Sequence, residues 1–215
     1  MRPVTVTVGP LATASANNIC LSQTPTATFT INGALASSGV ATLDTARRVL
    51  FTPAANESAN KFTIVGTSAN GAPQTEIVTG ANAAAFYSNL DFKTVSSITV
   101  SSAASGAITV GTNNVASSPW VRFDDYALSQ VAIQATVSGT VVYTLQQTLD
   151  DPNSSTQNVT AYGMTWLNTN DSAAVNATSS LQSSYQYAPT FARITLTSGT
   201  GFVTATFTQF GVVPY

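Results

Sequence analysis

Histidine is absent from this chain of 215 residues, and cysteine occurs once. Charged residues are also scarce, with seven Lys and Arg and nine Asp and Glu. General acid–base catalysis and nucleophilic catalysis rely mainly on His, Cys, Asp, Glu and Lys. A Ser-His-Asp triad is excluded outright because it needs a histidine. The composition therefore predicts a protein that is not an enzyme and that uses no cofactor.

A disulfide framework and a membrane span are also missing from the sequence. Cys20 has no second cysteine to pair with, so we expect it to be a small buried apolar residue. No apolar run reaches the roughly 18 residues that a membrane-spanning helix needs. The first eight residues alternate at once and lack the apolar centre of a signal peptide. We therefore expect the chain to fold in a cytoplasm, without oxidation and without a membrane partner.

The low charge bears on possible partners. Charged residues make up 7% of the chain, against roughly 25% in typical soluble domains. A net charge of −2 argues against nucleic acid, which requires clustered bases. The adjacent bases Arg47 and Arg48 are expected on a solvated strand face. A surface of Thr, Ser, Asn and Gln can pack on a like surface with little charge to desolvate, so we expect a homo-oligomer.

The most prominent pattern in the sequence is an alternation of apolar and polar residues with a period of two. Residues 4–8 and 27–31 place apolar side chains on one face and threonines on the other. No convincing amphipathic helix occurs. Further strands are expected at 48–52, 61–66, 74–79, 96–101, 107–112, 131–137, 142–149, 192–197 and 202–209. The sequence therefore predicts an all-β fold.

A polar, turn-rich stretch at 111–119 has no alternation and is the best candidate for a domain boundary. Each side of it holds several short strands at the spacing typical of sandwiches and barrels. We expect two small β-sandwich domains in tandem, at 1–116 and 117–215. One continuous β-sandwich is the alternative.

Two short turns and one long connection organise the second half. Ser138-Gly139 between alternating runs predicts one hairpin, and 198–201 predicts a second hairpin between 192–197 and 202–209. The intervening residues 150–189 are expected to be irregular. Connections this long in compact domains tend to be functional or to pack against a partner.

Two carboxylate pairs, Asp124-Asp125 and Asp150-Asp151, are the candidates for acid chemistry. Neighbouring residues of a strand point to opposite faces, so neither pair can act on one substrate by itself. The run Asp150–Asn153 is typical of a turn and lacks the spacing of a calcium loop. We therefore predict neither a catalytic site nor a metal site.

The aromatic residues are more informative. Trp120 and Phe123 open the second half and are expected in its core. Four others fall in loops or at the chain end and are the candidates for contact with a partner: Trp166, Tyr185, Tyr187 and Tyr215. Exposed tyrosines offer large contact area at low entropic cost, which suits a protein or a carbohydrate. For Tyr185 and Tyr187 the sequence leaves interface and core equally open.

Several strand-and-turn phrases, distributed over most of the chain, are similar to those of tailed-bacteriophage virion proteins. They are residues 71–80, 87–100, 106–112, 118–120, 139–141, 150–153 and 213–215. The resemblance implies a small, β-rich structural component without enzymatic activity, assembled into the virion in the host cytoplasm. Its partners would be other virion proteins.

The resemblance does not distinguish the shell from the tail; within it we favour a tail, neck or fibre component, with a capsid decoration (cement) protein as the alternative. A second alternative is a carbohydrate- or receptor-binding β-sandwich, in which Trp166, Tyr185 and Tyr187 form a stacking platform for a host surface glycan.

Overall fold

A computed structural model describes residues 2–124, 127 and 130–211. These residues contain fifteen β-strands and one short 3-10 helix, with no α-helix among them. None of the described helical residues forms a segment long and apolar enough to cross a membrane. The chain is therefore all-β, which confirms the fold class predicted from the alternation.

The chain forms two compact units, called unit 1 and unit 2 below. Unit 1 comprises Met1–Leu11 and Ala116–Tyr215, and unit 2 comprises Ala12–Val115. The expected division at 1–116 and 117–215 differs, because the first eleven residues belong with the second half. The cause is strand pairing: β1 (Val4–Val8) runs antiparallel to β15 (Phe202–Gln209), from Val4↔Phe207 to Val8↔Val203.

The stretch expected to be an irregular boundary is largely a strand. β8 (Ile108–Ser117) includes it up to Ser117, and the last two residues of β8 pair with β14 (Phe191–Gly199) in unit 1. Its polar residues gave no alternation because several of them are buried, including Thr112, Ser117 and Ser118. The absence of alternation in this stretch therefore results from burial on both faces of the strand, and does not indicate a loop.

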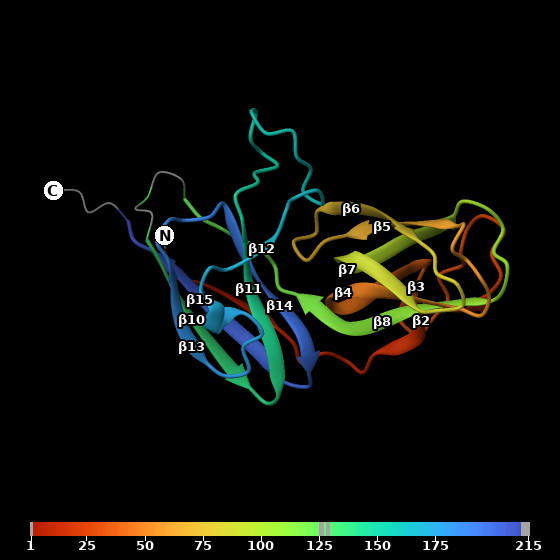
Figure 1. Cartoon of the computed structure of the whole chain (residues 1–215), viewed down its shortest axis with the longest axis horizontal. Helices are drawn as coiled ribbons and strands as arrows, with labels where there is room; N and C mark the ends of the chain where they lie inside the picture. Colours follow the sequence, from red (N-terminus) through yellow and green to blue (C-terminus); the bar gives the residue numbers. More distant parts are fainter. Residues whose placement is uncertain (1, 125–126, 128–129, 212–215) are drawn as a thin grey trace. The chain divides into compact units, whose positions relative to one another are not determined.

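Unit 1 is a sandwich of two antiparallel layers (Figure 1). The first layer, called sheet A, has the order β1-β15-β10-β13, with β10 at Val131–Ser138 and β13 at Leu181–Tyr185. The second layer has the order β12-β11-β14, with β11 at Val141–Thr148 and β12 at Leu167–Asn168. The short β9 (Val121–Arg122) also pairs with β14, and the 3-10 helix η1 spans Ser172–Ala174.

The core of unit 1 forms from the inward positions of both layers. In β10, Val131, Ile133 and Ala135 are buried, whereas the residues between them are exposed. Tyr143 and Leu145 face them from β11. Each fully buried aliphatic or Phe side chain contributes about 1.5–3 kcal/mol, so this alternation supplies the main stabilisation of the sandwich. Phe123 belongs to this core, as expected, and Trp120 is half-buried.

The two predicted hairpins are wrong, because each turn passes from one layer to the other. β10 pairs with β15 and β11 pairs with β14, so neither turn joins two paired strands. The turns stack on each other: the amides of Thr200 and Gly201 both donate to the carbonyl of Thr140, each at 3.0 Å. Gly139 (φ 78°) and Gly199 (φ 111°) adopt positive φ values that favour glycine. A hairpin and a layer-to-layer turn need the same glycines and the same alternation, so the sequence could not separate them.

The connection from Asp150 to Pro189 is less irregular than expected. It contains β12, η1 and β13, and β13 completes sheet A by pairing with β10 from Val131↔Tyr185 to Ala135↔Leu181. The strand was missed because its sequence, LQSSY, has only one aliphatic residue.

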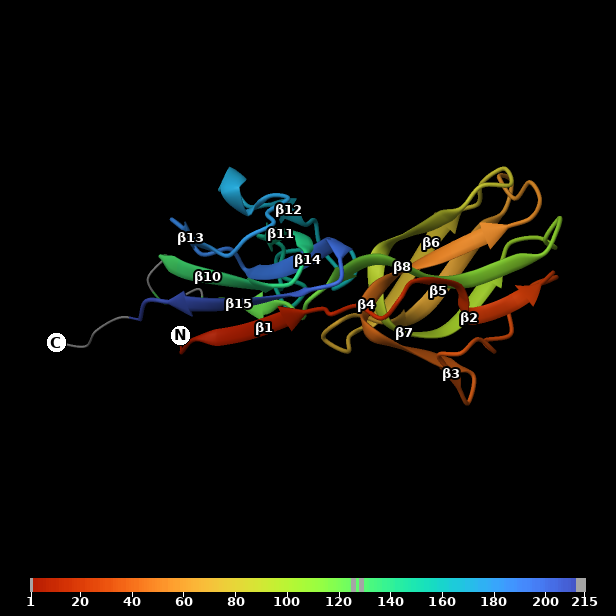
Figure 2. The same cartoon turned by 90° about the horizontal axis from the view of Figure 1, so that it is seen from below.

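Unit 2 contains one strongly bent sheet (Figure 2). Its order is β8-β4-β7-β5-β6, with β2 on β8 and β3 on β4. The strands are β2 (Ser15–Gln23), β3 (Ala36–Ser37), β4 (Val40–Pro53), β5 (Lys61–Thr67), β6 (Pro73–Thr79) and β7 (Phe86–Val100). Register shifts interrupt the β4–β7 and β5–β7 ladders. Such bulges bend a sheet, which here curls around a core of its own.

Aromatic rings fill much of the unit 2 core. Phe51 stacks on Phe86 with ring centroids 4.9 Å apart, and Phe62 lies 5.3 Å from Phe51. The predicted strand at 27–31 is not formed; only Thr28 makes an isolated bridge, to Thr99. Its alternation was nevertheless informative, because Phe29 and Ile31 are buried in this core. Cys20 is fully buried there too, as expected, and burial raises the pKa of its thiol to about 12.

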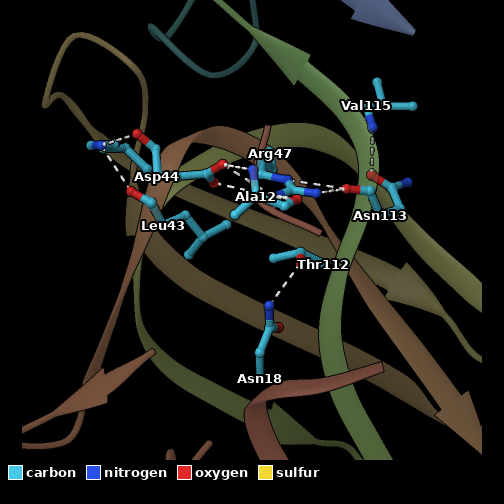
Figure 3. A network of polar contacts seen from close by, with 9 residues as sticks. Ala12, Asn18, Leu43, Asp44, Arg47, Thr112, Asn113 and Val115 are labelled. Carbon is cyan, nitrogen blue, oxygen red and sulfur yellow. Dashed lines mark hydrogen bonds and ion pairs between the residues drawn. The ribbon is translucent and has the colours of Figure 1, made fainter. Parts of the chain in front are cut away.

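The expectation that Arg47 lies on a solvated strand face is wrong, because its side chain is buried. Its side chain is 1% exposed, in a bulged part of β4. The guanidinium lies 3.2 Å from the Asp44 carboxylate, donates to the Ala12 carbonyl at 2.8 Å and donates to the Asn113 carbonyl through Nε and a terminal nitrogen (Figure 3). Ala12 and Asn113 lie close to the two ends of unit 2 in the sequence, so one buried base holds both ends of the unit. The Arg48 side chain, 29% exposed, is half-buried beside Asp91.

Candidate functional site

The carboxylates named from the sequence organise loops. Asp150 accepts a hydrogen bond from the Thr165 amide at 2.6 Å, and Asp151 accepts one from the Asn153 amide at 2.9 Å. Asp151 also pairs with Arg122 at 2.7 Å. The Asn153 amide, with Arg122, holds the pKa of Asp151 below its ordinary value. Asp125 lies outside the described residues.

Within the described part of the chain, no group of three or more His, Cys, Asp or Glu side chains could hold a metal ion. Lys93 is occupied by backbone carbonyls: its Nζ donates to Leu43 at 2.8 Å and to Asp44 at 3.0 Å.

The stacking platform expected from three aromatics is not assembled. Tyr185 is 6% exposed and packs edge-on against Phe123 in the unit 1 core. Trp166 is half-buried, with the Arg193 guanidinium 4.3 Å from its ring centroid and Trp120 against its edge. Of the three, Tyr187 alone is well exposed, at 68%. The fourth candidate, Tyr215, lies outside the described residues.

Tyr185 is buried because of its register on β13. It pairs with Val131 of β10, and both have the parity that points into the sandwich. Burial raises the pKa of the Tyr185 phenol, and Thr169 partly offsets this rise. Tyr187 follows two residues later, beyond the end of the strand, where no partner strand covers it. Tyr185 in the core and Tyr187 on the surface are thus only two positions apart in the chain.

These two tyrosines line a polar pocket in unit 1, called the Tyr187 pocket below. Its volume is about 280 Å³. β11, β13 and the two residues after β13 form part of the wall, and the segment before η1 forms the rest. The other lining residues are Gln147, Thr169, Asn170, Asp171, Ser184 and Gln186. The pocket thus lies where an edge strand of sheet A and a strand of the second layer approach each other.

Sequence reasoning missed the polar lining of this pocket. Gln147 has the same parity as the buried Tyr143 and Leu145, so an amide occupies a position expected to be apolar. That break in the alternation was a usable signal, since polar residues at core positions need a specific reason. Thr169, Asn170 and Asp171 carried no such signal, because they are distant in sequence from both strands.

The outer face of sheet A is a second candidate site. Its outward residues are Thr5 and Thr7 of β1, Phe202, Thr204, Thr206 and Thr208 of β15, Ala132, Gln134, Thr136 and Ser138 of β10, and Gln182 and Ser184 of β13. None of the four strands contains a charged residue. Thr5, Thr206, Gln134 and Gln182 form one continuous row across the sheet.

Hydroxyls on this face satisfy each other. The Thr5 and Thr206 hydroxyls lie 2.9 Å apart, as do those of Thr7 and Thr204. Cross-strand threonine pairs of this kind stabilise a sheet by roughly 0.2–1 kcal/mol each. Because these hydroxyls bind each other, fewer donors and acceptors on this face depend on hydrogen bonds to water. The face is therefore polar yet cheaper to desolvate than a charged one.

No protein-family model matches this sequence, and a search among curated proteins finds no significant match to it.

Proposed function

We propose that the chain is a non-enzymatic structural component of a tailed-phage virion, present in many copies on the particle exterior. The observation that carries the proposal is the uncharged outer face of sheet A, which spans four strands and twelve outward residues. Burying a charge in an interface costs several kcal/mol unless it is well paired, and this face contains none to bury. Its threonine pairs reduce the remaining desolvation cost.

Attachment in many copies fits such a face. A contact without strong charge pairs or a large apolar patch is weak by itself. Repetition over a symmetric particle multiplies weak contacts into strong attachment, because later contacts form at high effective concentration. The similarity of the strand-and-turn phrases to virion proteins supports the same assignment.

Within this proposal, a tail, neck or fibre component is favoured, and capsid decoration is the alternative. A closed ring, or a fibre-like dimer or trimer, would favour the tail. A monomer or trimer seated between capsomers would favour decoration. Cryo-electron microscopy of intact particles distinguishes them by whether the density for this chain lies on the shell or at a vertex or tail.

The uncharged face can be tested by adding one charge to it. Gln134→Lys and Thr206→Lys lie in the middle of the face, and Thr79→Lys is the matched control on an exposed position of unit 2. Gln134→Lys and Thr79→Lys should fold with stability changes within about 0.5 kcal/mol, as is usual for surface substitutions. Thr206→Lys should also fold, but it loses the hydroxyl pair with Thr5, which costs roughly 0.2–1 kcal/mol. The first two should lose attachment to particles that lack the wild-type chain, whereas Thr79→Lys should keep it. Attachment of all three would remove the face from the proposal, and wild-type protein that never attaches would refute the virion assignment.

A second candidate function is recognition of a surface glycan. The specific observation in its favour is the exposed Tyr187 ring beside a polar pocket. It does not compete with the first function, since exterior virion components can also contact a host.

A further inference from the structure

The Tyr187 pocket has the composition of a site for an uncharged, hydroxyl-rich ligand. Amides and hydroxyls dominate its lining, through Gln147, Gln186, Asn170, Thr169 and Ser184. The one charged residue is Asp171, and no lysine or arginine lines the pocket. Phosphate, sulfate and carboxylate ligands need cations or helix N-termini and would be repelled here. The charge pattern therefore selects against anions.

Two polar atoms of the lining residues are poorly matched within the protein. Gln147 Oε1 is buried and has no hydrogen-bond partner among the described residues. The Tyr185 hydroxyl is buried as well. Thr169 lowers its pKa, but no contact to this hydroxyl has the geometry of a full hydrogen bond in the described structure. Unmatched buried polar groups cost about 1–3 kcal/mol each, so a ligand that supplies the missing partners would gain affinity.

Asp171 is held in a fixed orientation. One carboxylate oxygen accepts from the Ala173 amide at 3.0 Å, where Asp171 caps η1, and the other accepts from the Ser183 hydroxyl at 2.7 Å. Each oxygen has further acceptor capacity, because an ionised carboxylate offers about four lone-pair sites in all. A carboxylate already fixed by the protein loses little entropy when a ligand hydroxyl donates to it.

We propose that the Tyr187 pocket binds one neutral sugar residue. The Tyr187 ring packs against the apolar C–H face of the sugar, and Asp171, Asn170, Gln147 and Gln186 bind its hydroxyls. A sugar suits the site because it presents an apolar face together with hydroxyls that both donate and accept. This inference rests on the second candidate function and is independent of the virion assignment.

The size of the pocket sets how much of a glycan it can hold. At about 280 Å³ it lies just below the range of about 300–1,000 Å³ for small-molecule sites, which suits a single ring. A second hollow of about 510 Å³ shares Ser184, Tyr185 and Gln186 with it and has the exposed Phe210 at its wall. A second sugar ring could occupy that hollow, so disaccharides should bind more tightly than the corresponding monosaccharides.

The test is a titration of the full chain in which saturation-transfer difference NMR measures binding. The ligands are the methyl glycosides of glucose, galactose, mannose, rhamnose and N-acetylglucosamine. N-acetylneuraminic acid is the anionic comparison. We expect saturable binding of at least one neutral sugar in the millimolar range and weaker binding of the acidic one. Tyr187→Ala should lower the affinity roughly tenfold, the equivalent of about 1.4 kcal/mol. Tyr162→Ala removes a 42% exposed tyrosine that does not line the pocket and should leave the affinity unchanged.

Three results would overturn the proposal: no saturable binding of any neutral sugar up to roughly 50 mM, preferred binding of the acidic sugar, or equal affinities for wild type and a folded Tyr187→Ala. Near-UV circular dichroism establishes that the variant is folded, and Gln147→Ala provides a second variant of the lining, from β11. Because free sugars are the probe, failure here leaves particle attachment untouched. Conversely, a chain that binds sugar but never attaches to particles would refute only the virion assignment.

Discussion

Units 1 and 2 are similar in size and strand content, but they use polar side chains in opposite ways. Unit 2 buries charged residues: Arg47, Glu57 and Asp91 are all at most 6% exposed, and the first two bind backbone groups of the same unit. Unit 1 leaves the whole outer face of sheet A uncharged, and the polar residues of the Tyr187 pocket face a cavity. Buried charges therefore help to hold the fold of unit 2, whereas unit 1 leaves an uncharged face and a polar pocket available to partners and ligands.

The two units also contain separate natural probes, which makes the comparison measurable. Cys20, the single cysteine, is buried in the core of unit 2, and its raised pKa keeps the thiol protonated near neutral pH. Both tryptophans, Trp120 and Trp166, belong to unit 1. Thiol labelling thus reports the opening of unit 2, and tryptophan fluorescence reports the unfolding of unit 1.

The largest effect is expected from Arg47→Met. The change leaves the carbonyls of Ala12 and Asn113 without their charged donor, whereas the exposed Asp44 carboxylate keeps its bond from the Ala12 amide. Hydrogen bonds from a charged group contribute about 1.5–3 kcal/mol each, so the loss of both carbonyl contacts should cost about 3–6 kcal/mol. Cys20 labelling should therefore become much faster, with little change in the urea midpoint of tryptophan fluorescence. Lys61→Gln, which removes an exposed base from the same unit, is the control and should change neither signal. Equal shifts of both signals would mean that the two units unfold together.

Glu57→Gln should have the next largest effect. Glu57 is fully buried; its carboxylate accepts from the amides of Ser105 and Gly106 at 2.7 and 3.2 Å and from Asn60 Nδ2 at 2.6 Å. Hydrogen bonds to a charged group contribute about 1.5–3 kcal/mol, and an amide cannot accept on both sides. The free energy of opening, measured through Cys20, should fall by about that amount.

Glu76→Gln is the matched control for this change, because Glu76 also accepts two backbone amides, from Asn89 and Leu90, but is only half-buried. Water can replace the lost bonds there, so its effect should be smaller. An equal or larger effect of Glu76→Gln would show that burial does not set the strength of these contacts.

Tyr143→Phe examines the same question in unit 1. Tyr143 is a core residue whose hydroxyl donates to the Ser179 carbonyl at 3.0 Å, and burial raises the pKa of its phenol. Its loss should cost about 0.5–1.5 kcal/mol, the usual net contribution of a neutral hydrogen bond. The fluorescence midpoint should move slightly, and Cys20 labelling should be unaffected. A loss as large as that of Arg47→Met would contradict the contrast between the units. Tyr162→Phe, at an exposed position, is the control.

The sequence predicts where strands form better than it predicts which strands pair. Alternation in 131–137 and 202–209 identifies β10 and β15 correctly, because one face of each is buried. It carries no information on whether the next strand continues in the same layer. The turns after β10 and β14 were therefore assigned as hairpins, although both cross between layers. The prediction that Arg47 lies on a solvated face was wrong for a related reason, because a bulge in β4 can redirect a side chain without any signal in the composition.

The candidate site was predictable only in part. Tyr187 stood out as an aromatic in a polar loop, and it is exposed. Tyr185 has the same local composition and is buried, because pairing with Val131 decides its direction. Gln147 and Asp171 join the pocket through contacts between segments distant in sequence, and a single sequence holds no record of such contacts.

The smallest effect concerns Asp151, a surface carboxylate of unit 1. The Asn153 amide and the Arg122 guanidinium both favour its charged form and lower its pKa. A carboxyl group with a lowered folded-state pKa stabilises the protein above the ordinary value, and this contribution disappears as the pH falls through the folded-state pKa. Asp151→Asn should therefore cost about 1 kcal/mol or less at neutral pH, because Arg122 is solvent-exposed and the pair is screened.

Urea unfolding of wild type and Asp151→Asn, followed by tryptophan fluorescence between about pH 7 and pH 2.5, measures this contribution. The difference in unfolding free energy should be constant near neutral pH and vanish in acid. Added salt should reduce the Arg122 part and leave the backbone part from Asn153. A difference that persists unchanged at the lowest pH would mean that the side chain acts through packing and not through its charge. In that case a surface charge of unit 1 would support its fold as the buried charges of unit 2 do, and the contrast between the units would narrow.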